Sequence, residues 1–464
     1  MLESKVQHRA TIRPTLIGLA IIILLLGAQS GADSHEIDGD PIRSGDLTKE
    51  GALALSSRTD LASARADLGF DPNQSTIELL LEDAESRAGL LETGLLLTAS
   101  ERAQYDARMS MVDSMREPLM QANRLDGFSG ARLEHIGDGI FHIYHTSSVA
   151  GQQVAALFQE KIPPSASVQF HSVTHSISEL MQQQDRLWSL LYDSEKGALG
   201  VHAIGVDVAA NKLIVELDSN ISLTDRVSQH GLVSKIYSHM KRIDFDITFS
   251  ELGTDSVCNH PDNCVNPMMA GIKITKGSQN GAACSLGFMV VDGADTQALT
   301  AGHCGWSGST SWYHNGYGSS SFGSEIDDDA YFDIGRDGML IQVPDNQGSN
   351  DVALCHDWGC IQITNYLTNS ELYGGMPVSM MGQFSGLKTG TIKDTQYSWW
   401  SNTCGCQQYG FSATYTSSNG DSGGPVWRGN NAVGLHSGGS SSSYRRAVPI
   451  EYLLVYYDVD VRTS

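Results

Sequence analysis

The sequence predicts an all-β domain in the C-terminal half of the chain, preceded by an α+β region. From about residue 247 onward, short strand-like runs alternate with turns rich in glycine and serine, a pattern typical of a β-sandwich or barrel. Before that point, helical periodicity gives way to alternating runs that contain no cysteine. With 41% hydrophobic and only 18% charged residues, the composition indicates folded domains rather than disorder.

Length and charge narrow the classes of function. A chain of 464 residues has room for two or three domains, or for one large domain with attachments. The formal net charge is −23. With acidic residues so much in excess, we expect no basic patch on the surface. A nucleic-acid role is therefore not expected.

The first 32 residues predict a secretory signal peptide. Lys5, Arg9 and Arg13 form a positive segment, an apolar core follows at residues 16–26, and small residues then offer cleavage sites. The alternative is an uncleaved signal anchor, but the apolar run is shorter than the ~20 residues that span a bilayer. We therefore expect a secreted, extracellular or periplasmic protein.

The next segment, residues 33–70, is polar and shows no sustained period, so we expect a flexible lead-in. Helical spacing of apolar residues predicts helices over 77–97 and 100–125. Thr98 followed by Glu101 fits a capping box at the start of the second helix.

Residues 130–247 predict a small α+β region. Alternating apolar and polar residues at 140–144 and at 212–217 are typical of strands, and a helix is expected over 177–191. This region contains no cysteine and no cluster of catalytic side-chain types.

The eight cysteines all lie in the C-terminal half. An even number in an exported chain indicates disulfides, and the spacing of a zinc site is missing. Cys258 and Cys264 are close enough to pair within a short loop. Four others leave three connectivities open: Cys355, Cys360, Cys404 and Cys406.

Two motifs in this half indicate nucleophilic catalysis: Thr-Ala-Gly-His-Cys at 300–304 and Gly-Asp-Ser-Gly-Gly-Pro at 420–425. A serine hydroxyl such as that of Ser422 needs a neighbouring base, here His303, because a serine alone is a poor nucleophile at neutral pH. Glycines around the serine let the backbone turn tightly. Backbone N–H groups of Gly420 and Ser422 could then form an oxyanion hole.

These motifs resemble those of the chymotrypsin-fold serine proteases, specifically the streptogrisin and α-lytic protease group. The resemblance covers roughly residues 270–461 and includes Cys-Ser-Leu-Gly-Phe at 284–288 and Gly-Leu-His-Ser-Gly-Gly at 434–439. It implies two six-stranded antiparallel β-barrels with the active site between them, a serine endopeptidase activity on peptides or proteins, and no cofactor or metal. It also implies a disulfide between Cys284 and Cys304.

The third catalytic residue has several candidates in one acidic window: Glu325, Asp327, Asp328, Asp329, Asp333 and Asp337. The family pattern is an aspartate followed by an apolar strand. Asp337, followed by Gly-Met-Leu-Ile at 338–341, fits that pattern best. Asp333 is the alternative.

The resemblance further implies a domain order of signal peptide (1–32), propeptide (33–252) and protease domain (253–464). In that group the pro-region assists folding and then inhibits the enzyme. The competing interpretation is a catalytically silent binding protein on a protease fold. Such proteins typically lack the histidine or the serine, and this chain retains both.

Residues around Ser422 and Ser437 are expected to line the pocket for the side chain before the scissile bond. The expected lining residues are Thr416, Ser417, Asn419, His436, Ser437, Gly438 and Gly439. Thr416 stands where relatives that cut after Arg or Lys are expected to hold a carboxylate, so the default expectation is a large apolar side chain. If His436 lines the pocket, a glutamate is expected instead.

Overall fold

The computed structural model describes residues 47–137, 139–162, 166–191, 201–218, 245–250, 268–293, 295–305, 311–314, 320–326, 335–344, 348–352, 361–401, 405–441 and 444–463. The predicted signal peptide and the predicted 252/253 domain boundary lie outside these ranges. None of the helices in the described ranges is both long and apolar enough to span a bilayer. We call residues 47–250 the N-terminal region and residues 268–463 the C-terminal region.

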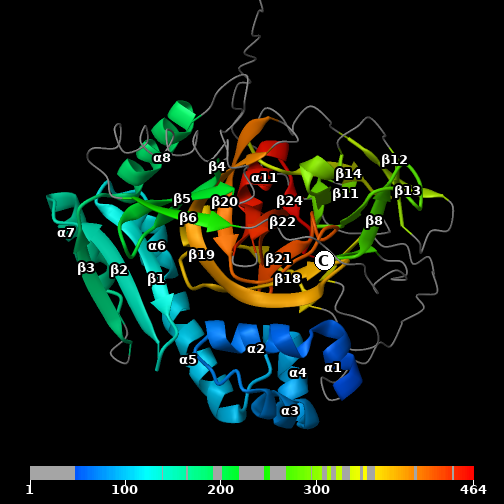
Figure 1. The fold of residues 1–464 in the computed structure, drawn as a ribbon, viewed down its shortest axis with the longest axis horizontal. Helices are drawn as coiled ribbons and strands as arrows, with labels where there is room; N and C mark the ends of the chain where they lie inside the picture. Colours follow the sequence, from blue (N-terminus) through cyan, green and yellow to red (C-terminus); the bar gives the residue numbers. More distant parts are fainter. Residues whose placement is uncertain are drawn as a thin grey trace, which may run out of the picture. The chain divides into compact units, whose positions relative to one another are not determined.

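The N-terminal region begins with six helices: α1 (Lys49–Leu55), α2 (Arg58–Asp67), α3 (Gln74–Glu82), α4 (Ala84–Thr93), α5 (Ala99–Ser114) and α6 (Arg116–Ala122). The prediction of a flexible lead-in is wrong for residues 47–70, which form α1 and α2 (Figure 1). Thr48 and Ser57 cap these helices through their side-chain oxygens. Leu61 and Leu68 are buried, so tertiary packing stabilises helices that are too short to form alone.

The helix predicted over 77–97 is divided into α3 and α4. Asp83 lies between them, and its carboxylate accepts the backbone N–H of Ser86 at 2.8 Å, which starts a new helix. The capping box predicted at Thr98 and Glu101 is confirmed.

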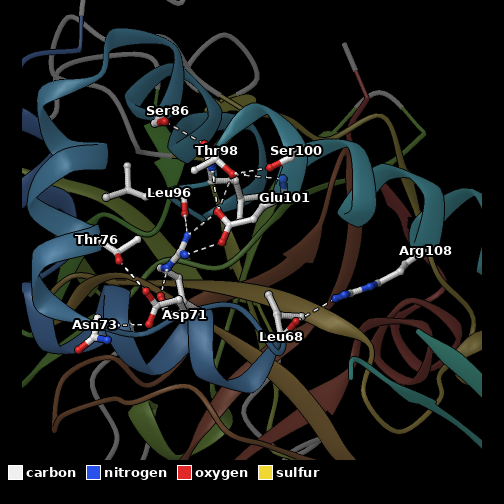
Figure 2. A network of polar contacts seen from close by, with 12 residues as sticks. Leu68, Asp71, Asn73, Thr76, Ser86, Leu96, Thr98, Ser100, Glu101 and Arg108 are labelled. Atoms are coloured by element: carbon white, nitrogen blue, oxygen red, sulfur yellow. Dashed lines mark hydrogen bonds and ion pairs between the residues drawn. The ribbon is translucent and has the colours of Figure 1, made fainter. Parts of the chain in front are cut away.

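A buried cation, Arg65, fixes α2 to the start of α5. Three residues that accept its hydrogen bonds, Asp71, Leu96 and Glu101, are labelled in Figure 2. The guanidinium of Arg65, which is fully buried, donates to the carbonyls of Asp71 (2.7 Å) and Leu96 (2.6 Å) and to the carboxylate of Glu101 (2.7 Å). A buried charge is tolerated only when it is paired and hydrogen-bonded. Removing Glu101 would leave that charge uncompensated.

Two groups of three strands complete the N-terminal region; the first is a separate sheet, and the second belongs to the barrel sheet described below. The first has the order β1–β2–β3 (Phe128–Glu134, Ile140–Thr146, Val168–Val173), and α7 (Val149–Gln159) packs against it. The second is formed by β4 (Val201–Asp207), β5 (Lys212–Asp218) and β6 (Phe245–Ser250), with α8 (Ile177–Leu191) beside β4 and β5. The strands and the helix predicted at 140–144, 212–217 and 177–191 are therefore confirmed.

The first half of the C-terminal region, together with β24 from its end, forms a β-sheet with the strand order β24–β10–β11–β14–β13–β12–β8–β9. Its strands are β8 (Lys273–Lys276), β9 (Ala283–Ser285), β10 (Met289–Asp292), β11 (Asp295–Thr300), β12 (Ser311–Tyr313), β13 (Ser321–Glu325), β14 (Met339–Gln342) and β24 (Asp460–Val461). Short strands β7 (Met268–Ala270), β15 (Gly348–Val352) and β16 (Ile361–Gln362) form a second, three-stranded sheet. The core between these strands is apolar and includes Trp312 and Ile341, both fully buried.

The second half closes into a six-stranded barrel of order β18–β21–β22–β23–β20–β19, because β18 also pairs with β19. Its strands are β18 (Pro377–Gly382), β19 (Gly386–Ser401), β20 (Cys406–Ala413), β21 (Pro425–Arg428), β22 (Asn431–Ser441) and β23 (Tyr444–Pro449). Strand β17 (Asn365–Tyr366) and helix α11 (Ile450–Tyr457) pack against β22. The predicted fold class, an all-β domain after an α+β region, is confirmed.

The N-terminal region continues the sheet of this barrel. Strand β4 pairs antiparallel with β19, with Ala203, Ile204 and Gly205 opposite Trp399, Ser398 and Tyr397. Such strand addition at a sheet edge supplies main-chain hydrogen bonds. The indole N–H of Trp188 also donates to the Ser398 hydroxyl at 2.7 Å. At a second place, the β1 backbone exchanges hydrogen bonds with Gly374.

Helices α1 and α2 contact β19 from another direction. Asp60 of α2 forms an ion pair with Lys388 at 2.6 Å and accepts a hydrogen bond from the Thr416 hydroxyl at 2.8 Å. Asp67 accepts a further bond from Thr414 at 2.6 Å. The N-terminal region therefore contacts the C-terminal region through its first helices as well as through its strands.

Candidate active site

His303 lies in a short 3₁₀ turn, Gly302–Cys304, directly after β11. The turn is fixed by a disulfide between Cys284 and Cys304, whose Cα atoms are 6.4 Å apart. This is the pair that the family resemblance implies. Cys406 is also disulfide-bonded, whereas Cys258, Cys264, Cys355, Cys360 and Cys404 lie outside the described residues.

Asp337 lies directly against His303. One carboxylate oxygen accepts the backbone N–H of His303 at 2.8 Å, and the other lies 2.6 Å from the ring Nδ1. The hydroxyl of Ser437 donates to the second oxygen at 2.5 Å. Because an ionised carboxylate can only accept, the ring proton must lie on Nδ1, which leaves Nε2 as the basic nitrogen.

Asp337 remains ionised despite its burial. Burial by itself opposes ionisation, but the charge and hydrogen bonds of His303 and the hydrogen bond of Ser437 outweigh it and hold the pKa below its ordinary value. A permanent negative charge at this position can stabilise the imidazolium that forms when His303 accepts a proton. Asp333, the alternative candidate, lies outside the described residues.

Ser422 lies in a tight turn between β20 and β21 that depends on two glycines. Gly420 and Gly423 have φ angles of +99° and +86°, in the left-handed region that favours glycine. The carboxylate of Asp421 accepts the backbone N–H groups of Phe384, Ser385 and Ser418 at 2.7–2.9 Å. This buried side chain joins the segment before the nucleophile candidate to the connection between β18 and β19.

The backbone amides of this turn are divided into two sets. Asp421 donates its N–H to Ser418 O, and Gly423 donates its N–H to His436 O. In the part of the chain that the structure describes, the amides of Gly420 and Ser422 donate to no protein acceptor. Two adjacent unpaired donors beside a serine hydroxyl are what an oxyanion hole requires.

Ser285 links the turn to the half of the domain that carries His303. Its N–H donates to Ser422 O at 2.8 Å, and its hydroxyl donates to Gly420 O at 3.0 Å. The same hydroxyl accepts the N–H of Gln383 at 2.8 Å. Ser285 was not among the expected site residues, although its place next to Cys284 in the 284–288 motif was a signal. Since Cys284 is bridged to Cys304, this contact brings Ser422 to the loop of His303.

The residues predicted to line the substrate pocket differ in their contacts and exposure. Ser437 contacts Asp337, Asn419 is exposed, and the Thr416 side chain bonds to Asp60 of the N-terminal region. Ser417 O accepts a hydrogen bond from a guanidinium nitrogen of Arg445 at 3.2 Å. The Arg445 side chain also packs on Gly439.

His436 is buried, with 1% of its surface exposed. Its Nδ1 lies 3.1 Å from the hydroxyl of Tyr415. Burial, followed by the positive charges of Arg445 and Arg446, lowers the pKa of His436 to about 3. The ring is therefore neutral at neutral pH.

Some known proteins are similar to this chain. No protein-family model matches it. Streptogrisin-D of Streptomyces griseus is 28% identical over 275 residues, which make up 58% of this chain and 60% of that protein. The chain therefore spans less than two thirds of this relative.

Two solved structures are also similar. A glutamic acid specific serine protease that uses a histidine triad in substrate binding is 24% identical; the match covers 42% of this chain and 100% of that one, with a TM-score of 0.36. Protease A of Thermobifida fusca is 26% identical; the match covers 42% of this chain and 98% of that one, with a TM-score of 0.36.

Proposed function

We propose that this chain, a relative of the streptogrisin-type chymotrypsin-fold serine proteases, is a secreted serine endopeptidase that is made as an inactive precursor. The observation that supports this most is the geometry around His303. Its Nδ1 is held by Asp337, and the turn bearing Ser422 presents two unpaired amides next to the hydroxyl. These are the groups that acyl transfer requires.

In the proposed mechanism, Ser422 Oγ attacks the scissile carbonyl carbon while Nε2 of His303 accepts the hydroxyl proton. The negative charge that develops on the carbonyl oxygen is stabilised by the N–H groups of Gly420 and Ser422. His303 then gives its proton to the leaving amine as the C–N bond breaks, which leaves an acyl-enzyme on Ser422. Water, deprotonated by His303, attacks the ester and releases the acid product.

The direct test is labelling with a serine-directed phosphonate. We expect one equivalent to attach to Ser422 in the processed protein, as seen by mass spectrometry of the labelled peptide, and none in Ser422→Ala. A catalytically silent binding protein, the competing function, would take up no label in either the wild-type protein or Ser422→Ala.

For the side chain before the scissile bond, we propose the two alternatives that the sequence allows. A large apolar residue is favoured by the absence of a carboxylate at Thr416 and by the small residues Gly438 and Gly439. A glutamate is favoured if a hydrogen-bonding group lines the pocket, for which His436 is the candidate from the sequence.

We further propose that the N-terminal region is a propeptide, within bounds of 33–252, that follows a signal peptide at 1–32 and precedes a protease domain at 253–464. The pairing of β4 with β19 and the contacts of Asp60 support this. A barrel built from long-range strand pairs folds slowly because its free-energy barrier to folding is high. A segment that pairs with one of its strands can lower that free-energy barrier. The same contacts would keep the region bound after folding.

This proposal predicts the behaviour of a shortened chain. A variant that joins the predicted signal peptide (1–32) directly to Thr254 should be secreted poorly or remain inactive, because β19 would lack its pairing with β4 during folding. Co-expression of residues 34–249 as a separate chain behind the same signal peptide should restore activity, measured as peptide hydrolysis in the culture medium. Full activity of the shortened chain by itself would contradict a folding role for residues 34–249.

Acid should weaken binding of the N-terminal region, because of His135. The ring of His135, 5% exposed, donates through Nε2 to Gly375 O at 2.7 Å, while its buried Nδ1 has no partner among the described residues. Arg108 of α5 and Arg132 of β1 are the charged groups that act on it. Burial, followed by these charges, lowers the pKa of His135 to about 4 from an ordinary value of 6.5.

The bound state therefore favours the neutral ring, whereas the dissociated state binds a proton below about pH 6.5. Affinity should be full above pH 6.5 and fall as the pH drops toward 4, by up to about 300-fold for this group. The measurement is inhibition of the processed enzyme by residues 34–249 at pH 7.5 and pH 5. His135→Gln, which keeps a donor but does not titrate, should show a flatter dependence. An unchanged pH dependence in His135→Gln would exclude this role.

A further inference from the structure

We infer that Arg445 is the residue that contacts the substrate side chain before the scissile bond, and that it selects an acidic one. This inference rests on the proposed endopeptidase function and names its substrate class. It assigns the selection to a residue on β23 that no motif in the sequence indicated.

The guanidinium of Arg445 lies between the two segments predicted to form the pocket walls. Nη2 donates to Ser417 O at 3.2 Å, which belongs to the segment before Ser422. On the other side, a Cβ atom added to Gly439 would lie 2.6 Å from Cδ and 2.8 Å from Nη1 of Arg445. The side chain therefore occupies the space that the absence of a side chain at Gly439 leaves open.

Both walls are joined to the catalytic groups. Ser418, which follows Ser417, donates its N–H to the carboxylate of Asp421 beside Ser422. Ser437, two residues before Gly439, donates its hydroxyl to Asp337. Because each wall lies within a few residues of a reacting or positioning group, a cation between them faces the side chain of a bound substrate.

His436 cannot supply the positive charge that an acidic side chain needs. It is buried against Tyr415, and its low pKa keeps it neutral over the range in which the enzyme would work. Arg445 and Arg446 of β23 both contribute to that shift. A guanidinium pairs with a carboxylate through two parallel charge-assisted hydrogen bonds, and it repels lysine and arginine side chains.

Arg446 provides a matched control. It follows Arg445 on the same strand, so the two side chains leave opposite faces of β23. The guanidinium carbon of Arg446 lies 5.4 Å from the ring centroid of Trp399 on β19. Arg446→Met removes the same charge as Arg445→Met from a neighbouring position, and it should leave the substrate preference in place.

The experiment compares matched peptides with Glu, Asp, Gln, Leu or Phe before the cleaved bond, using enzyme processed from the full chain and counted by phosphonate titration. Wild type should prefer the acidic peptides. Arg445→Met should lower kcat/KM for these peptides by roughly 100- to 1,000-fold, the loss of two charge-assisted hydrogen bonds, and should not lower it for Gln, Leu or Phe. Arg445→Lys, which keeps the charge but not the planar pair of donors, should retain a weakened acidic preference. If Arg445→Met does not fold, Arg445→Lys still tests whether the guanidinium selects the acidic side chain.

The inference is overturned if wild type prefers Leu or Phe to Glu and Asp, or if Arg446→Met shows the loss and Arg445→Met does not. A chain that takes up no phosphonate would overturn the proposed function itself, and the inference with it. The titration therefore separates the two failures.

Discussion

Replacing Ser422 with alanine should lower kcat/KM for peptide hydrolysis by about 10⁴-fold or more, while the protein still folds. The hydroxyl is the proposed nucleophile, and no other group in the described site can form the acyl-enzyme. The fold should persist because the turn is held by its backbone and by Asp421, through hydrogen bonds that alanine leaves intact.

His303→Ala should have a comparable effect, and the double variant should be little worse than either single one. The reason is that a nucleophile without its base, or a base without its nucleophile, contributes almost nothing. Thermal unfolding and retention of the Cys284–Cys304 disulfide serve as controls for folding. Ser320→Ala, the same change at an exposed serine, should keep full activity. Residual hydrolysis above a few per cent in purified Ser422→Ala would exclude Ser422 as the nucleophile.

Asp337→Asn should lower kcat by about 10⁴-fold, the size of effect that an amide has at an orienting carboxylate. The Asp337 carboxylate accepts the Nδ1 proton of His303 and the hydroxyl proton of Ser437 at the same oxygen. An amide NH₂ placed there would donate to Nδ1 and force the ring proton onto Nε2. The base would then be protonated on the nitrogen that must accept the proton of Ser422.

The measurement is kcat for a peptide that wild type cleaves, with Asp333→Asn as the matched control that should retain activity. Phosphonate labelling should slow in parallel with kcat, because both reactions need Nε2 as a base. Ser437→Ala should cause a smaller loss, since it removes one hydrogen bond to Asp337 but leaves the charge. If Asp333→Asn proves inactive and Asp337→Asn active, then the orienting carboxylate has been misassigned.

Several features followed from the sequence because each depends on a few neighbouring residues. The capping box of Thr98 and Glu101 is local, and the helix at 177–191 and the strands at 140–144 and 212–217 have regular periods. The motifs around His303 and Ser422 specify tight turns through their glycines. The pairing of Cys284 with Cys304 followed from the family resemblance, and the structure joins the same two residues.

The all-β region after an α+β region and the candidate groups for chemistry could thus be predicted from local patterns. Local patterns did not predict the helices within residues 47–70, the extension of the barrel by β4 at β19, or the contacts by which Ser285 joins the two halves at Ser422. Tertiary contacts also bury His436 and hold Arg445 between Ser417 and Gly439. The physical reason is the same in each case. These features depend on contacts between residues far apart in the chain, such as Asp60 with Lys388 and Ser285 with Gly420, and burial by distant segments determines both whether a short helix forms and whether a histidine carries charge.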